Sequence, residues 1–407
     1  MLRALRIASR AVETIAECGY VDPADPDATV ASAKLIGETG LLLLVAARVR
    51  DADAELSVAI ETLADRLAPH ARGRTMQMGL CLHPSLAQDY AYGHICLTAI
   101  DRPDPSFERL LSASLEAAEA VSRERPPHRE LEQRWLARLR QGGSGPSSEG
   151  PIYARMSALG RPLGAIRPAR DDLYAFTHAL MFAADFGREP LVSPRPVRAI
   201  LADVEAALSR CLDVEDYDLA GELLLAWPLL GAAWSDTAAF AFSVLGRIED
   251  EVGFLPAPIT RLDRYRSLPS NTERTRYAVA TIYHTAYVMG LLCAVLLGLA
   301  HRQASASLRI EAHAGIDFRA HLGPSDLLRP DGQAPHWLTD FARLDPAGQA
   351  ALAPMALTIA LQRACARHDF ADIRSILGEA LRAGAADVPA VQQAAGLLCR
   401  VAMVSLG

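Results

Sequence analysis

Three polar residues spaced seven apart in the segment 170–187 have the types that proton transfer needs. In a helix, which turns about 100° per residue, Asp171, His178 and Asp185 form one stripe, and Tyr174 lies one turn before the histidine. A carboxylate beside a histidine raises the pKa of the imidazole and orients its ring, as a general acid or base requires. The same stripe could instead be the solvated face of an amphipathic helix, because apolar residues occupy the opposite side.

A second set of polar residues lies in the first half of the apolar segment 277–300. Tyr277, Thr281, His284 and Tyr287 share one helix face. Burying an unpaired hydroxyl or imidazole costs roughly 1–3 kcal/mol, so these side chains should have partners or line a wet pocket. The alternative is a histidine whose hydrogen bonds are satisfied inside the core.

Glu222 is the third candidate, because it stands in the apolar run YDLAGELLLAWPLL. Such a carboxylate must be paired, protonated or at a cavity, and desolvation raises its pKa. Asp218 lies on the same helix face, and two carboxylates that share a site titrate separately. Asp218 could instead stabilise the start of a helix. Glu38, in another apolar run, follows Lys34 by one turn and is predicted to pair with it.

Two pairs of cysteine and histidine, each with one residue between its members, are candidates for zinc ligands. They are Cys81 with His83 and His94 with Cys96. Residues two apart on a helix point about 200° apart, so each pair could bind zinc only in a loop. The sequence shows no P-loop, no dinucleotide-binding glycine motif and no nucleophile elbow. We therefore expect neither a metal nor another cofactor.

The elements that position these residues are predicted to be helices. Apolar residues recur at spacings of three and four, and strand patterns are almost absent. The predicted helices are approximately 27–50, 53–70, 105–123, 129–140, 171–186, 195–211, 217–231, 235–249, 274–302, 347–367 and 370–383.

The order of helices and loops predicts five parts. They are N-terminal helical hairpins at 1–140, a flexible Gly, Ser and Pro linker at 141–151, a helical core at 152–305, an irregular loop or lid at 306–346, and C-terminal helices at 347–407 that close the same domain. The lid would carry His313 and His321.

A weak internal repeat indicates how the helices are joined. Residues 208–226 echo residues 361–380, and Asp216 with Tyr217 corresponds to Asp369 with its following phenylalanine. The aspartate can cap the next helix while the aromatic ring packs into the hairpin. Repeated hairpins form an open α-solenoid or close into an α/α toroid. Closure is favoured, because helices that are apolar all round must be buried.

Two motifs carry a resemblance to known proteins over about 170–300. AFAFSVLGRIEDEVGFLP at 239–256 resembles the helix-then-loop repeat of terpenoid-cyclase and lanthionine-cyclase toroids. THALMFAADFG at 177–187 with YHTAYVMG at 283–290 is similar to uncharacterised actinobacterial proteins found in natural-product settings. The lanthionine cyclases imply a zinc site with a Cys-His-Gly element, from which this chain departs.

The resemblance to terpenoid cyclases extends to two acidic runs. DVED at 213–216 is similar to their protonating motif, although it has a glutamate where the motif has an aspartate. DDLYA at 171–175 supplies half of a magnesium-binding motif and lacks its later acid. Terpenoid cyclisation therefore stays an alternative.

Charge and hydropathy limit the partners and the location. The net charge of −7 gives no basic surface for nucleic acid. Seven scattered cysteines and an N-terminal segment interrupted by arginines predict reduced thiols, no signal peptide and a cytoplasmic location. The segment 282–300 is long enough to cross a membrane, but its polar first half favours a buried helix with one end at a pocket.

These patterns predict a cyclase-like tailoring enzyme of natural-product biosynthesis that acts on a peptide precursor in a toroid cavity by metal-independent acid–base catalysis. The predicted catalytic residues are His178, His284, Tyr287, Asp185 and Asp171. The predicted substrate contacts are Glu222, Tyr174, Tyr283, Thr281 and Trp227. Partner biosynthetic enzymes could assist. The alternative from another class is a non-catalytic helical adaptor that binds a partner peptide or small molecule.

Overall fold

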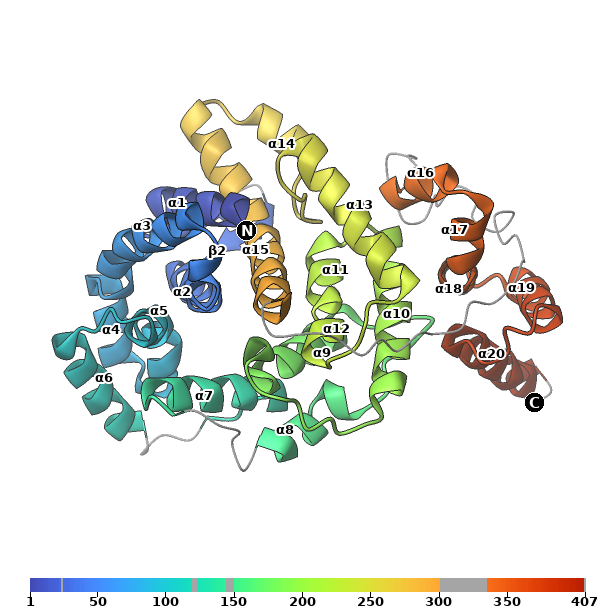
Figure 1. Ribbon diagram of the computed structural model, residues 1–407, viewed down its shortest axis with the longest axis horizontal. Coiled ribbons are helices and arrows are strands. Elements are labelled where there is room, and N and C mark those ends of the chain that lie inside the picture. Colours follow the sequence, from blue (N-terminus) through green and yellow to red (C-terminus); the bar gives the residue numbers. More distant parts are fainter. Residues whose placement is uncertain (23–24, 119–122, 144–149, 301–334, 406–407) are drawn as a thin grey trace. The chain divides into compact units, whose positions relative to one another are not determined.

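The computed structural model describes residues 1–22, 25–118, 123–143, 150–300 and 335–405, and within them the prediction of an all-α fold is confirmed (Figure 1). The chain forms two compact units. Unit 1 comprises Met1–Tyr153, Met181–Leu191 and Phe254–Ala304, and unit 2 comprises Ala154–Leu180, Val192–Gly253 and Ser305–Gly407. Residues 144–149 of the predicted linker and most of the predicted lid, with His313 and His321, lie outside the described residues.

Unit 1 is built around helices from its two ends in the sequence. Its main helices are α1 (Leu2–Ile15), α2 (Ser32–Ala47), α3 (Ala54–Ala71), α4 (Arg74–Leu82), α5 (Ala87–Ala99), α6 (Pro105–Ala118), α7 (Pro127–Arg140), α14 (Leu262–Ser267) and α15 (Asn271–Ala300). Short 3-10 turns stand at Arg50–Ala52, Pro84–Leu86 and Asp185–Gly187. The helix α8 (Gly150–Met156) crosses the boundary between the two units.

A short β-hairpin occupies the start of the helix predicted at 27–50. Strand β1 (Tyr20–Asp22) pairs antiparallel with β2 (Asp25–Val30), with Tyr20 opposite Val30. The expectation of a helix from residue 27 was wrong there, because the β-branched pair Thr29 and Val30 suits a strand. The helix α2 begins only at Ser32.

The long apolar helix α15 is a core element of unit 1. It packs against α1 and α2, and Figure 1 shows it in orange beside these blue helices. At Gly290 the backbone approaches so closely that an added Cβ would lie 2.7 Å from a methyl of Leu42 and 2.9 Å from the Cβ of Ala4. Among the described residues α15 alone is long and apolar enough to span a membrane, and 67% of its most apolar window is buried. This burial is what a core helix requires.

Helices α2 and α5 meet through glycines. A Cβ on Gly93 would lie 2.7 Å from the Cγ2 of Ile36 and 3.2 Å from the Cβ of Ala71. A Cβ on Gly40 would lie 2.9 Å from the Cα of Gly93. The two helix backbones can therefore come this close only because neither position carries a side chain.

We expect Gly93→Ala to lower the free energy of unfolding by about 1–3 kcal/mol, because the methyl group overpacks a contact between two backbones. Urea unfolding followed by circular dichroism measures the change. Gly246→Ala is the matched control, since nothing lies within 4 Å of its added Cβ. This helix-interior change should raise stability by about 0.5–1 kcal/mol. Equal effects of the two changes would contradict the packing argument.

Unit 2 is a second set of packed helices. They are most of α9 (Arg170–Ala183), with α10 (Val197–Asp213), α11 (Tyr217–Leu224), α12 (Ala226–Leu229), α13 (Asp236–Val252), α16 (His336–Arg343), α17 (Pro346–Ala351), α18 (Ala353–Ala366), α19 (Phe370–Arg382) and α20 (Pro389–Ser405). A 3-10 turn spans Ala158–Gly160. The predicted irregular segment therefore ends earlier than residue 346, since α16 occupies part of it.

The two predicted Asp-aromatic hairpin joints of unit 2 are confirmed. Asp216 caps α11 by accepting a hydrogen bond from the Leu219 amide, and Asp369 caps α19 by accepting one from the Asp372 amide. The residue before each aspartate has a left-handed backbone, with φ of 56° at Glu215 and 57° at His368. The repeat in the sequence thus encodes one turn geometry used twice.

A buried ion pair joins α10 to α18 within unit 2. Arg363 donates from Nε to Oδ2 of Asp213 at 2.9 Å and from Nη2 to Oδ1 at 2.6 Å. The indole Nε1 of Trp337 donates to Oδ1 of the same carboxylate at 3.1 Å. Both charged side chains are almost completely buried. Bidentate geometry with a third donor offsets the cost of removing these charges from water.

Candidate functional site

A polar cluster between α9 and α11 of unit 2 contains the first of the predicted histidines. The hydroxyl of Thr177 donates a hydrogen bond to Oε2 of Glu222. The other oxygen, Oε1, lies 3.9 Å from Nε2 of His178. Glu222 is 2% exposed, whereas His178 is 23% exposed. The carboxylate is therefore fixed inside the unit, and the imidazole beside it reaches the solvent.

Two further contacts tie the same helices together. Tyr174 donates its phenolic hydrogen bond to Asp218, and Nη2 of Arg170 donates to the Tyr174 oxygen at 3.1 Å. Nε of Arg170 pairs with Oδ2 of Asp216 at 2.8 Å. We call these seven residues the α9–α11 cluster: Arg170, Tyr174, Thr177, His178, Asp216, Asp218 and Glu222.

Helical spacing accounts for this arrangement. On α9 the residues Leu173, Phe176 and Leu180 are buried, and Tyr174 and His178 lie one turn apart beside them. Their rings meet edge to face with centroids 6.2 Å apart. On α11 the spacing of four between Asp218 and Glu222 presents both carboxylates to the same neighbouring helix.

The electrostatics of the cluster keep its phenol neutral. Burial, together with the carboxylates of Asp218 and Glu222, raises the pKa of Tyr174 well above its ordinary value. The phenol therefore holds its proton at neutral pH and acts as a hydrogen-bond donor. Asp218 and Glu222 are the oxygen ligands that the cluster could offer to a cation, and each already accepts a hydroxyl hydrogen bond.

Neither carboxylate predicted to orient His178, that of Asp171 or that of Asp185, is placed beside it. Asp171 is exposed at the start of α9. The helix ends at Ala183, so the spacing of seven does not continue to Asp185. The Asp185 carboxylate instead accepts hydrogen bonds from Arg48 at 2.7 Å and from the Trp135 indole at 2.8 Å, both in unit 1. Asp185 thus anchors a turn.

The second predicted histidine also lies beside a glutamate. In unit 1, Nε2 of His284 on α15 is 3.7 Å from Oε1 of Glu38 on α2. The predicted pair of Lys34 with Glu38 is also present, at 3.8 Å. The other oxygen of Glu38, Oε2, is buried and has no hydrogen-bond partner within the described ranges. Unit 1 therefore holds a second histidine–carboxylate pair, in which Oε2 of Glu38 is a buried acceptor without a hydrogen bond from any described residue.

The other polar residues of α15 are part of the core of unit 1. The hydroxyls of Tyr287 and Thr39 are 2.8 Å apart, and burial raises the pKa of Tyr287. The Thr281 hydroxyl donates to carbonyls of its own helix. Tyr283 is buried and packs edge to face on Tyr287, with centroids 5.3 Å apart. These three predicted site residues are therefore buried in the core of unit 1.

Trp227, predicted to contact substrate, is fully buried on α12 of unit 2. Its indole Nε1 has no hydrogen-bond partner in the part of the chain that the structure describes. The indole ring therefore packs in the core of unit 2. Its N–H group lies in apolar surroundings that offer no hydrogen-bond acceptor among the described residues.

The cysteine and histidine pairs considered for zinc stand in helical surroundings. His94 and Cys96 both lie on α5, two residues apart. Nδ1 of His94 accepts a hydrogen bond from Arg72 at 3.1 Å, and Nε2 lies 3.2 Å from Glu108. Burial raises the pKa of the Cys96 thiol, which opposes the thiolate that zinc needs. Cys81 is exposed.

Sequence reasoning missed three residues of these sites, which are Arg170, Thr177 and Glu38. Thr177 gave no signal, since a threonine in a helix is ordinary. Glu38 was assigned to Lys34 alone, because spacing within one helix shows only local partners. An isolated carboxylate in an apolar run was the available signal for Glu38, as it was for Glu222.

Comparison with known proteins gives one family. The family model described as "Domain of unknown function (DUF6895)" matches residues 2–294. Searches of curated proteins and of solved structures return no match. The matched range includes the α9–α11 cluster and the pair of His284 with Glu38.

Proposed function

The chain belongs to this family of unknown function, and we propose that it is an enzyme that works by acid–base catalysis with His178 as its proton-transfer group. The observation that carries the proposal is the sequence of contacts from Thr177 through Glu222 to His178. A base oriented by a second group, itself held by a third, is the general arrangement of activated catalytic residues.

Each residue of this arrangement has a distinct part in the proposal. Glu222 is a positioning residue, since it is buried and held by Thr177. His178 is exposed enough to meet a substrate. The separation of 3.9 Å exceeds a hydrogen bond, and such contacts are often loose in a free enzyme and shorten when substrate binds. Tyr174, neutral and edge-on to the imidazole, borders the place where substrate would lie.

The finer proposal is a cyclase-like tailoring enzyme that acts on a peptide precursor within a closed α/α toroid, without a metal and in the cytoplasm. Its support is the helical-hairpin architecture with one joint used twice in unit 2. Proton delivery and removal suffice for ring closure by addition or by loss of water. Terpenoid cyclisation is the neighbouring alternative.

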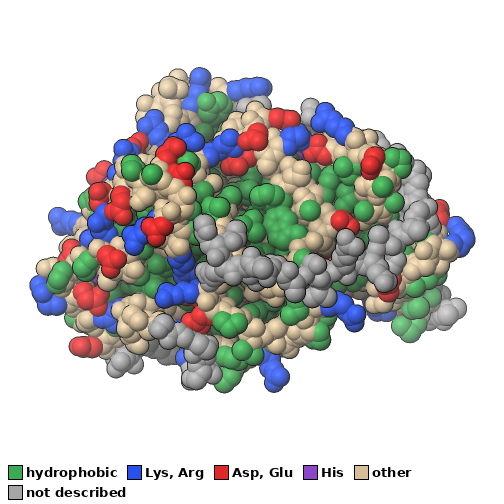
Figure 2. All heavy atoms as spheres, viewed as in Figure 1, with side chains coloured by type: hydrophobic (Ala, Val, Ile, Leu, Met, Phe, Trp, Pro, Cys, Tyr) green, Lys and Arg blue, Asp and Glu red, His purple; other side chains and the backbone are tan. Residues whose placement is uncertain are grey.

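The partners proposed are the substrate and enzymes of the same biosynthesis, and nucleic acid is not among them. On the face in Figure 2, basic and acidic side chains are interspersed. The net charge is −7. The described residues on this face form no basic stripe of the kind that phosphate binding needs.

Deletion of the gene in its natural host, followed by mass spectrometry of peptide and small-molecule extracts, tests the proposal. A precursor should accumulate and a product of equal mass, or of mass lower by one water, should disappear. Restoring the gene should restore the product. Unchanged extracts, together with capture of a bound peptide by the purified protein, would favour the non-catalytic adaptor instead.

A further inference from the structure

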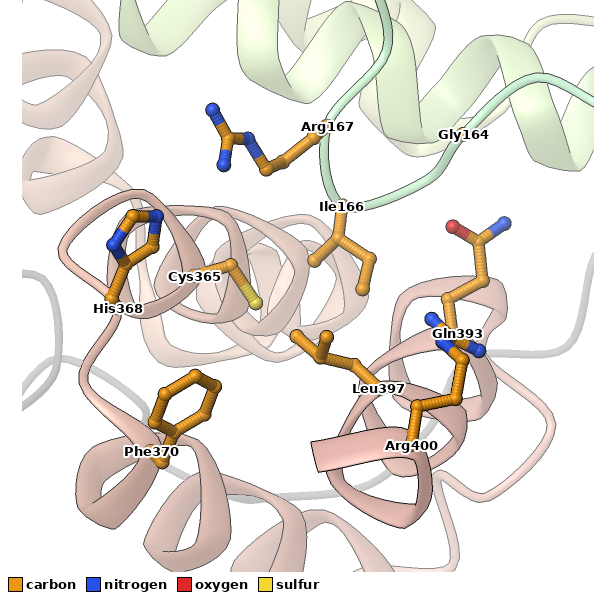
Figure 3. Close-up of a pocket in the computed structure, with 9 residues that line it drawn as sticks. All are labelled: Gly164, Ile166, Arg167, Cys365, His368, Phe370, Gln393, Leu397 and Arg400. Carbon is orange, nitrogen blue, oxygen red and sulfur yellow. The ribbon is translucent and has the colours of Figure 1, made fainter. Parts of the chain in front are cut away.

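A pocket in unit 2, separate from the α9–α11 cluster, has the features of a ligand site. It has a volume of about 520 Å³, within the usual range of small-molecule sites of ~300–1,000 Å³. One wall is the loop through Gly164, Ile166 and Arg167, and the others come from α18, the turn before α19, and α20 (Figure 3). The lining residues are Gly164, Ile166, Arg167, Cys365, His368, Phe370, Gln393, Leu397 and Arg400.

The middle of the pocket is apolar. Figure 3 shows Ile166, Cys365, Phe370 and Leu397 facing the same space. Burial raises the pKa of the Cys365 thiol to about 11, against the opposing effect of Arg167. The thiol therefore stays protonated at neutral pH and belongs to the apolar wall. It is not poised as a nucleophile.

Two guanidinium groups lie on opposite sides of this apolar middle. Arg167 extends from the loop, and Arg400 extends from α20 on the far side of Leu397 (Figure 3). Neither has an ion pair or side-chain hydrogen bond with any described residue. Among the described residues that line the pocket, none is acidic. By contrast, Arg195 in the same unit forms an ion pair with Asp203. The pocket thus offers two separate positive charges across an apolar floor.

The wall that carries Arg167 is held in place by amide side chains. Oε1 of Gln393 accepts a hydrogen bond from the Ala165 amide at 2.7 Å. Nε2 of Gln362 donates to the Ala165 carbonyl at 2.7 Å and to the Ala206 carbonyl at 2.9 Å. These bonds pin the loop to α20, α18 and α10. The pocket is therefore preformed, which lowers the entropic cost of binding.

We propose that this pocket binds a small dianion with an apolar spacer, of the class of medium-chain aliphatic dicarboxylates. One carboxylate pairs with Arg167 and the other with Arg400, and the spacer lies on Ile166 and Leu397. Guanidinium groups suit carboxylates because their planar donors match the two oxygens. The site goes beyond the proposed catalysis, and six of its nine lining residues lie outside residues 2–294, which the family model matches.

Isothermal titration calorimetry of the full chain with octanedioate tests the proposal. Octanoate, which has one carboxylate, and octane-1,8-diol, which has none, are the matched ligands. We expect octanedioate to bind, octanoate to bind about tenfold more weakly for the loss of one charged pair, and the diol not to bind. Added salt should weaken octanedioate binding, because both charges are near the surface.

The variants R167Q and R400Q should each lower the affinity for octanedioate about tenfold and leave octanoate binding through the remaining arginine. R374Q is the control, since Arg374 is exposed on α19 and does not line the pocket. Both arginines are exposed, so these variants should keep the melting temperature of the parent chain. Absence of octanedioate binding, equal binding of the diol, or affinity unchanged in both variants would overturn the proposal.

Discussion

Replacing His178 by alanine is expected to slow product formation by about 100- to 10,000-fold, the usual contribution of a positioned acid or base. The reason is the loss of the imidazole that stands between Glu222 and the solvent. Product formed per unit time by purified variants, on the precursor identified from the gene deletion, measures the effect. Circular dichroism and the melting temperature establish that the variant is folded.

Further variants distinguish a residue that transfers the proton from one that positions it. Glu222→Gln keeps the hydrogen bond from Thr177 but removes the charge, so it should lower kcat with little change in KM and alter the pH profile. His83→Ala is the control, because His83 is an exposed histidine stacked on Tyr90. His284→Ala tests the pair in unit 1 by itself. Full activity of His178→Ala in folded protein would rule out the proposed mechanism, and full activity of His284→Ala would rule out a catalytic role for the pair in unit 1.

Asp213→Ala is expected to lower the free energy of unfolding by about 3–5 kcal/mol, because it leaves the guanidinium of Arg363 buried without its carboxylate. The indole of Trp337 loses its acceptor as well. A change of this size is a large fraction of the stability of a typical domain. Urea unfolding followed by tryptophan fluorescence measures it.

The control for this ion pair is one at the surface. Arg367 pairs with Asp372 at 2.9 Å and is 37% exposed. Arg367→Ala should therefore change the stability by less than about 1 kcal/mol. The double variant of Asp213→Leu with Arg363→Met should recover part of the loss, since apolar residues can fill the site of a buried pair. If Asp213→Ala costs no more than Arg367→Ala, the pair has no role in stability.

Local signals in the sequence were enough to predict many of the helices and two of their joints, whereas α4, α5 and α20 fall outside the predicted ranges. The capping aspartates Asp216 and Asp369 were predictable because a cap involves only the next three residues. The hairpin at Tyr20–Asp22 and Asp25–Val30 was missed, because its two strands are too short to show alternation. The helix α16 was missed because the sequence before it is rich in glycine and proline.

The candidate site was predictable in its residue types and not in its pairings. His178 and Glu222 were both singled out, but their contact depends on how α9 packs against α11, which no spacing within one helix reveals. Asp185 was misplaced for a different reason. Left-handed backbone at Asp185 and Phe186, with φ of 43° and 50°, ends the helical stripe and turns the carboxylate toward Arg48 and Trp135.

The packing of α15 against α1 and α2 has a consequence for how the protein is made. Helices α1 and α2 leave the ribosome more than two hundred residues before α15 does. The parts of their apolar faces that contact α15 therefore stay uncovered through much of translation, and contacts of such large sequence separation form slowly. We expect nascent chains that stop before residue 271 to bind holding chaperones, and release to follow the synthesis of α15.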